Sequence, residues 1–389
     1  MSLLSELEEE GFVLPDFRNS ILEVAKELGR YSGRLVGDKD KKIFILIDGM
    51  GYELLMDLFN EKHSLKKEFE KVRVEKITTI FTSSTMNVLS TLYSGRTTAE
   101  HGVVGSHLFL KESGIMIDSI KLAPAMDKHA KSEKINAKRI FLSNDTIKSI
   151  KANGKRFKMI MPSDIVNSGL SVATFDKGDI IPYITVQDMI VKLRKGIVAE
   201  NYDCILAYSY DIDTIEHAYG SESEEAHHAL YSLLESILMH VLPLAKEHGY
   251  DLIITADHGQ INTKFEDLRI VRYDDMLMKY LDMPLWGSSR AVFMKSRNGE
   301  EDKLEEYISK RFRDEGILIR SEEAIRSGLF GAPRVSDELR YRFGDYLYLP
   351  KGPRGLYFLY PEMEQQVYDY KGMHGGLSSR EMYIPLVLG

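Results

Sequence analysis

The sequence predicts an α/β fold in which a doubly wound, mostly parallel sheet is flanked by helices. Three short runs, residues 42–48, 204–208 and 251–257, are apolar on both faces, as buried parallel strands are. Segments with helical spacing separate such runs, among them residues 186–198 and 222–248. Strands that alternate with helices in this way form parallel sheets covered on both faces.

The length of 389 residues suits one large domain, since 43% of the residues are hydrophobic and 28% are charged. We expect residues 1–389 to form this single α/β domain. Residues 265–345 are more polar and helix-like, with a charged segment at 299–313. We expect residues 265–345 to be an inserted cap subdomain.

Charge and composition exclude several classes of protein. A net charge of −8 argues against a broad nucleic-acid surface, so we expect no nucleic-acid polymer as a partner. The single cysteine, Cys204, cannot form an intramolecular disulfide. Residues 1–16 lack the pattern of a secretory signal, and no apolar run approaches the ~18 residues of a membrane span. We therefore expect a soluble, cytoplasmic protein without a membrane partner.

The first expected strand ends in the turn Asp48-Gly49-Met50-Gly51. In doubly wound sheets, ligands bind beyond the carboxyl ends of the strands. Glycines let the backbone approach such a ligand closely, and the next helix presents its N-terminus to an anion. An Asp-Gly turn by itself is more often only a turn.

A cluster of four hydroxyl residues stands where a helix ending near Gly95 is expected to begin: Thr82, Ser83, Ser84 and Thr85. Hydroxyl residues at a helix start are usually N-caps, but four exceed what capping needs. A hydroxyl at a helix N-terminus and close to a metal ion is also well placed to ionise and attack phosphorus.

Further metal-ligand types follow the second and third expected strands. Asp213 and His217 are four positions apart, so they share one face of a helix and can hold one cation. Asp257-His258-Gly259 comes directly after the third strand, where a sharp turn would bring both side chains to one ion. The structural alternative for the first pair is a solvated helix start.

The last of these residues is His374, which precedes Gly375 and Gly376. A histidine in a glycine-rich loop is more often structural than a ligand. Considered together, however, three aspartates, three histidines and the hydroxyl cluster make two cation sites of mixed oxygen and nitrogen ligands.

In this order the motifs resemble the alkaline phosphatase superfamily, specifically its type I phosphodiesterase/nucleotide pyrophosphatase family. The resemblance spans about residues 42–388 and includes the ending His374-Gly375-Gly376-Leu377-Ser378, Glu381-Met382 and Ile384-Pro385-Leu386. It implies an alkaline-phosphatase-like fold. It also implies a hydrolase that uses two divalent cations to cleave a small phosphate ester or nucleotide.

The resemblance also implies a role for each site residue. It assigns two groups of metal ligands: Asp213, His217 and His374 for one cation, and Asp48, Asp257, His258 and the Thr85 hydroxyl for the other. Thr85 rather than Ser84 is the implied nucleophile, because the family's nucleophile precedes the helix-terminal glycine, here Gly95, by ten positions. Such mixed ligands favour zinc, and manganese accepts the same ligand types.

Two positions depart from the nucleotide pyrophosphatase pattern. Met86-Asn87-Val88 replaces Phe-Pro-Asn, and Ser106, followed by His107, replaces an asparagine that holds a phosphate oxygen. We expect a phosphodiesterase/nucleotide pyrophosphatase that acts through a covalent phosphothreonine. A phosphomonoesterase or phosphonate hydrolase is the alternative, with a cation such as Arg290 holding a third phosphate oxygen. A non-catalytic binding protein is disfavoured, because none of the seven groups is missing.

Overall fold

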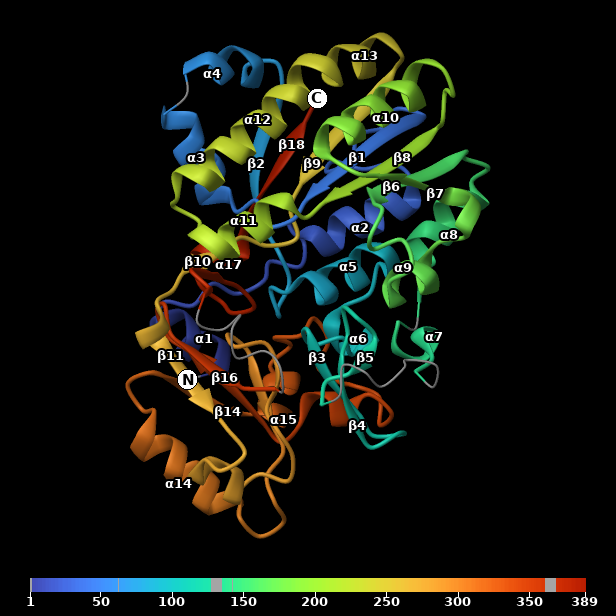
Figure 1. The fold of residues 1–389 in the computed structure, drawn as a ribbon. Helices are drawn as coiled ribbons and strands as arrows, with labels where there is room; N and C mark the ends of the chain where they lie inside the picture. Colours follow the sequence, from blue (N-terminus) through green and yellow to red (C-terminus); the bar gives the residue numbers. More distant parts are fainter. Residues whose placement is uncertain (1, 62, 127–134, 142, 361–368) are drawn as a thin grey trace.

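A computed structural model describes residues 2–61, 63–126, 135–141, 143–360 and 369–389 of the chain. Two sheets lie one above the other along the long axis of the molecule (Figure 1). The larger central sheet occupies the upper part of that view, together with the C-terminus. The smaller second sheet and the N-terminus occupy the lower part.

Seven strands form the central sheet: β1 (Lys41–Ile47), β2 (Arg73–Thr78), β6 (Phe157–Pro162), β7 (Ile180–Tyr183), β8 (Cys204–Ser209), β9 (Tyr250–Thr255) and β18 (Tyr383–Leu388). Their order is β2-β18-β9-β1-β8-β6-β7. All pairings from β9 to β7 are parallel, whereas β18 runs antiparallel between β9 and β2. The predicted α/β fold with a mostly parallel sheet is confirmed, and the three expected strands are its centre.

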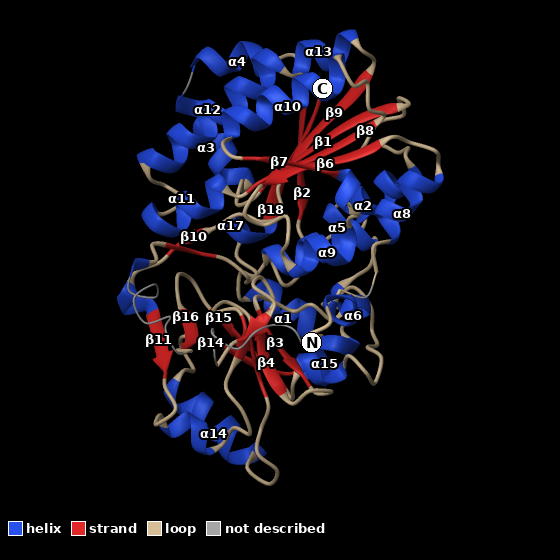
Figure 2. Ribbon diagram, turned by 45° about the vertical axis from the view of Figure 1, so that its right-hand side comes forward, coloured by secondary structure: helices blue, strands red, loops and turns tan. Residues whose placement is uncertain are grey.

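Helices cover both faces of this sheet (Figure 2). On one face α2, α5 and α8 contact one another, with the bounds Ile21–Arg30, Thr85–Ser94 and Asp145–Ala152. On the other face lie α3 (Tyr52–Glu61), α4 (His63–Phe69), α10 (Val186–Val198), α12 (Glu224–His240) and α13 (Leu242–Glu247). The expected helix over residues 186–198 is α10. The expected helix over residues 222–248 is divided into α12 and α13, because Pro243 begins a new helix.

The segment Glu224–Glu247 is, among the described residues, the one helical stretch long and apolar enough to cross a membrane by length and composition. Core helices of soluble proteins meet the same criterion. Here α12 buries one face, including Leu230, Leu234 and Ile237, within the helical layer. The cellular location of the protein stays a prediction.

The second sheet combines strands from two distant parts of the chain. The earlier part contributes β3 (His107–Leu110), β4 (Ile115–Asp118) and β5 (Ala123–Pro124). The later part contributes β12 (Trp286–Gly287), β13 (Val292–Met294), β14 (Gly316–Arg320) and β15 (Tyr346–Pro350). The two parts meet where Gly287 of β12 pairs with His107 of β3. The division into a main domain and an inserted cap over residues 265–345 stays a prediction.

Shorter elements complete the described fold. Two small pairs of strands are β10 (Ile261–Asn262) with β17 (Gly372–Met373) and β11 (Leu268–Val271) with β16 (Gly355–Phe358). The remaining α-helices are α1 (Leu3–Glu9), α6 (Thr98–His101), α7 (Ala137–Ile140), α9 (Gly169–Thr174), α11 (Asp211–Tyr219), α14 (Glu301–Arg311), α15 (Ser321–Arg326) and α17 (Ser379–Met382). Short 3-10 turns occupy Lys177–Asp179, Phe265–Asp267, Met276–Lys279 and Arg340–Phe343.

Glycines bring the loops at the carboxyl edge of the central sheet close together. Gly49, which follows β1, has φ +81°, and a Cβ atom there would lie 2.9 Å from the Cα of Asp213. At Gly259, after β9, a Cβ atom would lie 2.7 Å from the Cα of Gly51, in the loop after β1. Only glycine fits these two turns, so the loops after β1, β8 and β9 converge on one place.

Candidate active site

The structure brings all seven predicted site residues together at the carboxyl edge of the central sheet. Their positions follow from the elements that carry them: Asp48 after β1, Thr85 at the start of α5, Asp213 and His217 on α11, Asp257 and His258 after β9, and His374 after β17. Pairing of β10 with β17 brings the loop of His374 back beside the loop that follows β9. The chemical role of each residue stays a prediction.

Three side-chain oxygens lie close to one imidazole nitrogen next to the start of α5. The Nε2 atom of His258 lies 3.1 Å from Thr85 Oγ1, 3.3 Å from Asp257 Oδ2 and 3.5 Å from Asp48 Oδ1. Ligand atoms about 2 Å from a tetrahedral cation are roughly 3.3 Å from one another. The spacing of this group, which we call the His258 group, therefore suits one cation.

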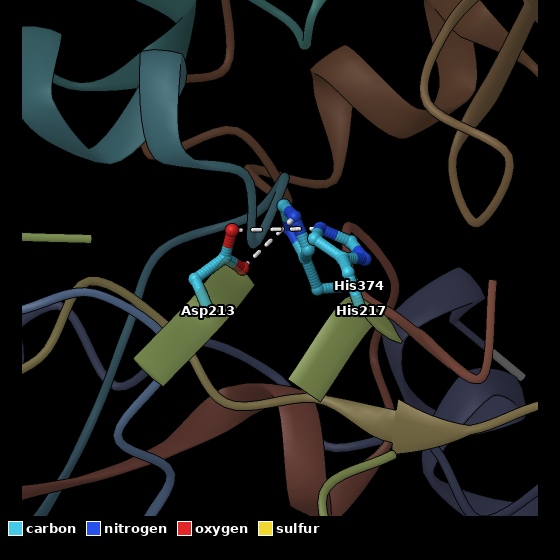
Figure 3. Close-up of side chains that lie close together, drawn as sticks. All are labelled: Asp213, His217 and His374. Atoms are coloured by element: carbon cyan, nitrogen blue, oxygen red, sulfur yellow. Dashed lines mark ion pairs between the residues drawn. The ribbon is translucent and has the colours of Figure 1, made fainter. Parts of the chain in front are cut away.

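A second group consists of Asp213, His217 and His374. The Nε2 atom of His217 lies 3.5 Å from Asp213 Oδ2, and that of His374 lies 3.7 Å from Asp213 Oδ1. Figure 3 shows Asp213 and His217 side by side on α11, with both imidazoles directed at the carboxylate. This Asp213 group can bind a second cation.

The two groups share a boundary. The imidazole rings of His258 and His374 stack, with centroids 3.7 Å apart and planes inclined by 12°. Donor atoms of Asp48, Asp213 and His258 also lie within 4.8 Å of one another, so Asp213 faces both groups. Two adjacent cations are therefore compatible with the arrangement of these side chains.

Backbone carbonyls orient the histidines toward the centre of the site. The Nδ1 atom of His217 donates to the carbonyl of Gly372 at 2.8 Å, and that of His374 donates to the carbonyl of Ser83 at 3.0 Å. A carbonyl only accepts, so Nδ1 carries the proton and Nε2 presents its lone pair to the site. Burial also lowers the pKa of His374 to about 3, which keeps its imidazole neutral.

Among the residues that the structure describes, each carboxylate of the His258 group is satisfied by hydrogen bonds on one oxygen only. Within the described part of the chain, Asp48 Oδ1 and Asp257 Oδ2 are buried without a hydrogen-bond partner. Burial, followed by the charge of Asp257, raises the pKa of Asp48, and burial raises the pKa of Asp257 to about 7. Such buried oxygens need a partner, and a divalent cation fits the donor set.

The pKa of Asp213 moves in the opposite direction. Burial is the largest single effect and acts to raise it, but the three neighbouring histidines and the hydrogen bond from Gln260 together outweigh burial and lower the pKa. Asp213 is therefore ready to act as a carboxylate beside the two histidines.

The four residues of the hydroxyl cluster have different surroundings: some bond to the backbone of neighbouring loops, and one lies beside the metal-ligand residues. Thr82 Oγ1 donates to the carbonyl of Val104 at 2.9 Å, and Ser83 Oγ donates to the carbonyl of Gly376 at 2.7 Å. Ser84 is the N-cap of α5, and Thr85 places Oγ1 beside His258. This geometry favours Thr85 over Ser84 as the nucleophile.

Three neighbouring residues were not recognised in the sequence. The Tyr208 hydroxyl donates to Asp48 Oδ2, and Gln260 Nε2 donates to Asp213 Oδ1 at 2.5 Å. Glu216 is fully buried, and its two carboxylate oxygens have no hydrogen-bond partner among the described residues. The sequence could have indicated Tyr208, which lies near the end of β8, and Gln260, which directly follows Asp257-His258-Gly259. It does not show which atoms these side chains contact.

Arg290, the example of a cation for a third phosphate oxygen in the monoesterase alternative, is engaged elsewhere. Its side chain is 1% exposed, and its Nη2 atom lies 2.8 Å from Glu381 Oε2. Glu381 in turn accepts a hydrogen bond from the backbone N–H of Gly376 at 2.8 Å. The Arg290 charge is therefore used to anchor the loop that carries His374.

Two cavities meet at Thr85. The larger, of about 310 Å³, extends from the Asp213 group toward the second sheet, and both Ser106 and His107 line it. The smaller, of about 250 Å³, extends along α5 from Asp48 and is lined by apolar and aromatic side chains such as Leu89, Phe175 and Tyr210. Both cavities are therefore lined in part by the predicted nucleophile.

Comparison with known proteins agrees with this geometry. The sequence profile of the family described as type I phosphodiesterase / nucleotide pyrophosphatase matches residues 42–377. No curated protein matches the chain.

Two solved structures illustrate the shared fold. Human ectonucleotide pyrophosphatase / phosphodiesterase 5 has a TM-score of 0.64 and 16% identity, covering 89% of this chain and 87% of its own. Phosphonoacetate hydrolase from Sinorhizobium meliloti, bound to phosphonoacetate, has a TM-score of 0.61 and 16% identity, covering 92% of both chains. The family profile covers most of the chain, and the protein therefore belongs to the type I phosphodiesterase / nucleotide pyrophosphatase family, metal-dependent phosphoester hydrolases of the alkaline phosphatase superfamily.

Proposed function

We propose that the protein is a two-metal phosphodiesterase that acts through a covalent phosphothreonine at Thr85. The observation that carries this proposal is the 3.1 Å separation between Thr85 Oγ1 and His258 Nε2, within a group that also contains Asp48 and Asp257. A hydroxyl placed among metal-ligand atoms, at a helix N-terminus, is an activated nucleophile.

The reaction consists of two displacements at phosphorus. In the first, the Thr85 hydroxyl gives its proton to solvent and Oγ bonds to phosphorus, the bond from phosphorus to the leaving oxygen breaks, and solvent protonates the released oxyanion to the alcohol. In the second, the oxygen of a water bonds to phosphorus, the bond from phosphorus to Thr85 Oγ breaks, a phosphate monoester is released, and the Thr85 oxygen takes a proton from that water. Two inversions give overall retention of configuration at phosphorus.

The side chains divide these tasks. Asp48, Asp257 and His258 would hold one cation beside Thr85, and Asp213, His217 and His374 would hold the other. Divalent cations at these positions supply charge that favours the ionised hydroxyl and the departing oxyanion. We propose zinc, because the ligands are carboxylates and imidazoles, with manganese as the other candidate.

Two features support a diester as the substrate. The two cavities that meet at Thr85 provide space for two substituents on one phosphate. Arg290, a cation considered for the third oxygen of a monoester, is paired with Glu381 instead. A monoester carries one more unesterified oxygen, whose charge needs such a partner.

The covalent step is tested by mass spectrometry of the metal-loaded protein. The protein is mixed with bis-p-nitrophenyl phosphate, quenched in acid within one turnover and digested. A p-nitrophenyl phosphate adduct on Thr85 is the expected result, and it should be absent from Thr85→Ala. An adduct on Ser84, or burst-free hydrolysis without any adduct, would contradict the proposal.

The substrate class is tested with the same preparation. We expect kcat/KM for bis-p-nitrophenyl phosphate to exceed that for p-nitrophenyl phosphate. A clear preference for the monoester, or cleavage of phosphonoacetate, would instead favour a phosphomonoesterase or phosphonate hydrolase on the same metal core.

A further inference from the structure

We propose that the larger cavity is the leaving-group subsite and that it takes an uncharged alcohol bearing an aromatic or apolar ring. The preferred substrate would then be a phosphodiester with two such substituents and not a pyrophosphate, whose leaving group is a charged phosphate. This inference rests on the proposed function, in which Thr85 attacks phosphorus.

The direction of attack identifies the leaving-group side. Thr85 Oγ1 lies within the His258 group, so in an in-line displacement the leaving oxygen departs toward the Asp213 group. The larger cavity is lined by Asp213, His217 and His374. The smaller cavity is lined by Asp48 and Asp213 but by neither of those histidines, so it receives the substituent that remains on phosphorus.

Rings and apolar side chains dominate the wall of the larger cavity. The second sheet contributes Trp286 and His107, and β16 contributes Tyr357 and Phe358. The His107 ring stacks on Tyr360, with centroids 4.4 Å apart and planes inclined by 5°. A wall of this kind binds a ring of the substrate by burial and stacking.

The charges in this cavity do not suit an anionic leaving group. Apart from the Asp213 group, the charged side chains among its described lining residues are Asp118 and Lys121, whose Oδ2 and Nζ atoms lie 3.6 Å apart. Burial lowers the pKa of His107 to about 4, so this imidazole is neutral at neutral pH. A departing pyrophosphate would meet no net positive charge beyond the metal centre, because the Asp118 carboxylate balances the charge of Lys121.

Two substrates that share the transferred group test the inference. The p-nitrophenyl ester of thymidine 5′-monophosphate and thymidine triphosphate both transfer thymidine monophosphate to Thr85, but one releases a phenol and the other pyrophosphate. We expect kcat/KM for the aryl ester to be larger by about tenfold or more. Equal or better cleavage of the triphosphate at the same bond would overturn the inference while leaving the phosphodiesterase proposal intact.

Substitutions in the cavity separate recognition from intrinsic reactivity, because each variant is judged by the ratio of the two kcat/KM values. Asp118→Asn removes the carboxylate that balances Lys121 and should shift this ratio toward the triphosphate by about fivefold. Tyr357→Ala removes part of the apolar wall and should raise KM for the aryl ester more than for the triphosphate. The matched control, Asp302→Asn, makes the same change of charge at an exposed position on α14 and should not alter the ratio.

The outcomes are distinguishable. A ratio unchanged in folded Asp118→Asn and Tyr357→Ala would mean that the leaving group lies elsewhere, and the inference would fail alone. If neither substrate is cleaved by the metal-loaded protein, or if Thr85→Ala cleaves both at the normal rate, the proposed function fails and the inference fails with it.

Discussion

The two groups of metal-ligand residues differ in their exposure to solvent. In the His258 group, the side chains of Asp48, Asp257 and His258 are 0–2% exposed. In the Asp213 group, the exposed fractions are 25% for His217, 16% for Asp213 and 13% for His374. The buried group carries the predicted nucleophile, whereas the more exposed group faces the larger cavity.

This difference in exposure suits two different roles for the two groups. A buried group keeps its geometry fixed and strengthens electrostatic effects on the nucleophile, because little water screens its charges. A partly exposed group allows water and the leaving group to enter and depart. The four predictions below test this comparison, from the largest expected effect to the smallest.

The largest effect is expected at the nucleophile of the buried group. Thr85→Ala should reduce kcat by about a thousandfold or more, because a neighbouring hydroxyl does not replace an activated nucleophile. Thr85→Ser should retain measurable turnover, and Ser84→Ala should retain most of it. Turnover is measured with bis-p-nitrophenyl phosphate under saturating metal. If Ser84→Ala lost turnover while Thr85→Ala kept normal turnover, Ser84 and not Thr85 would be the nucleophile.

The second prediction concerns metal content. Asp213→Asn should weaken the binding of both cations, because Asp213 faces both groups. Asp257→Asn should weaken the binding of only the cation of the His258 group. Elemental analysis after dialysis should therefore find about one cation per chain in Asp257→Asn and fewer in Asp213→Asn. The comparison would be contradicted if Asp257→Asn lost both cations while Asp213→Asn kept both.

The third prediction compares the residues that hold each carboxylate in place. Tyr208→Phe removes the hydrogen bond to Asp48, and Gln260→Ala removes the bond to Asp213 Oδ1. Each change should lower metal affinity or kcat by about tenfold, as expected for groups that orient metal ligands. Metal titration of the chelated protein gives the affinity. An unchanged affinity and kcat in both variants would show that these bonds are dispensable.

The smallest effect is a dependence of stability on pH in the metal-free protein. The pKa of Asp257 rises from 3.8 to about 7 because of burial, so the folded state holds a proton that the unfolded chain has lost. The contribution of this protonated carboxyl to the free energy of unfolding is fully present below pH 3.8 and is lost as the pH rises through about 7. The Tm of chelated protein should therefore fall across this window, whereas added cation should raise Tm more at higher pH. A Tm independent of pH would contradict this account.

Much of the site could be predicted from the sequence because the motifs are local. Asp48 and Asp257 directly follow apolar runs, which became the neighbouring strands β1 and β9. Parallel neighbours end at the same edge of a sheet, so these carboxylates had to approach each other. The spacing of four between Asp213 and His217 likewise places them on one face of α11.

Contacts between distant segments were decided only by the tertiary structure. Pairing of Gly287 with His107 joins residues 107–124 to residues 286–350 in one sheet, and no local pattern encodes that contact. The same holds for Arg290, whose partner Glu381 lies 91 positions away, and for Tyr208, whose hydroxyl meets Asp48. Periodicity and motif spacing determine which residue types stand at strand ends, whereas the partner of a buried charge and the wall of a cavity depend on how complete elements pack against one another.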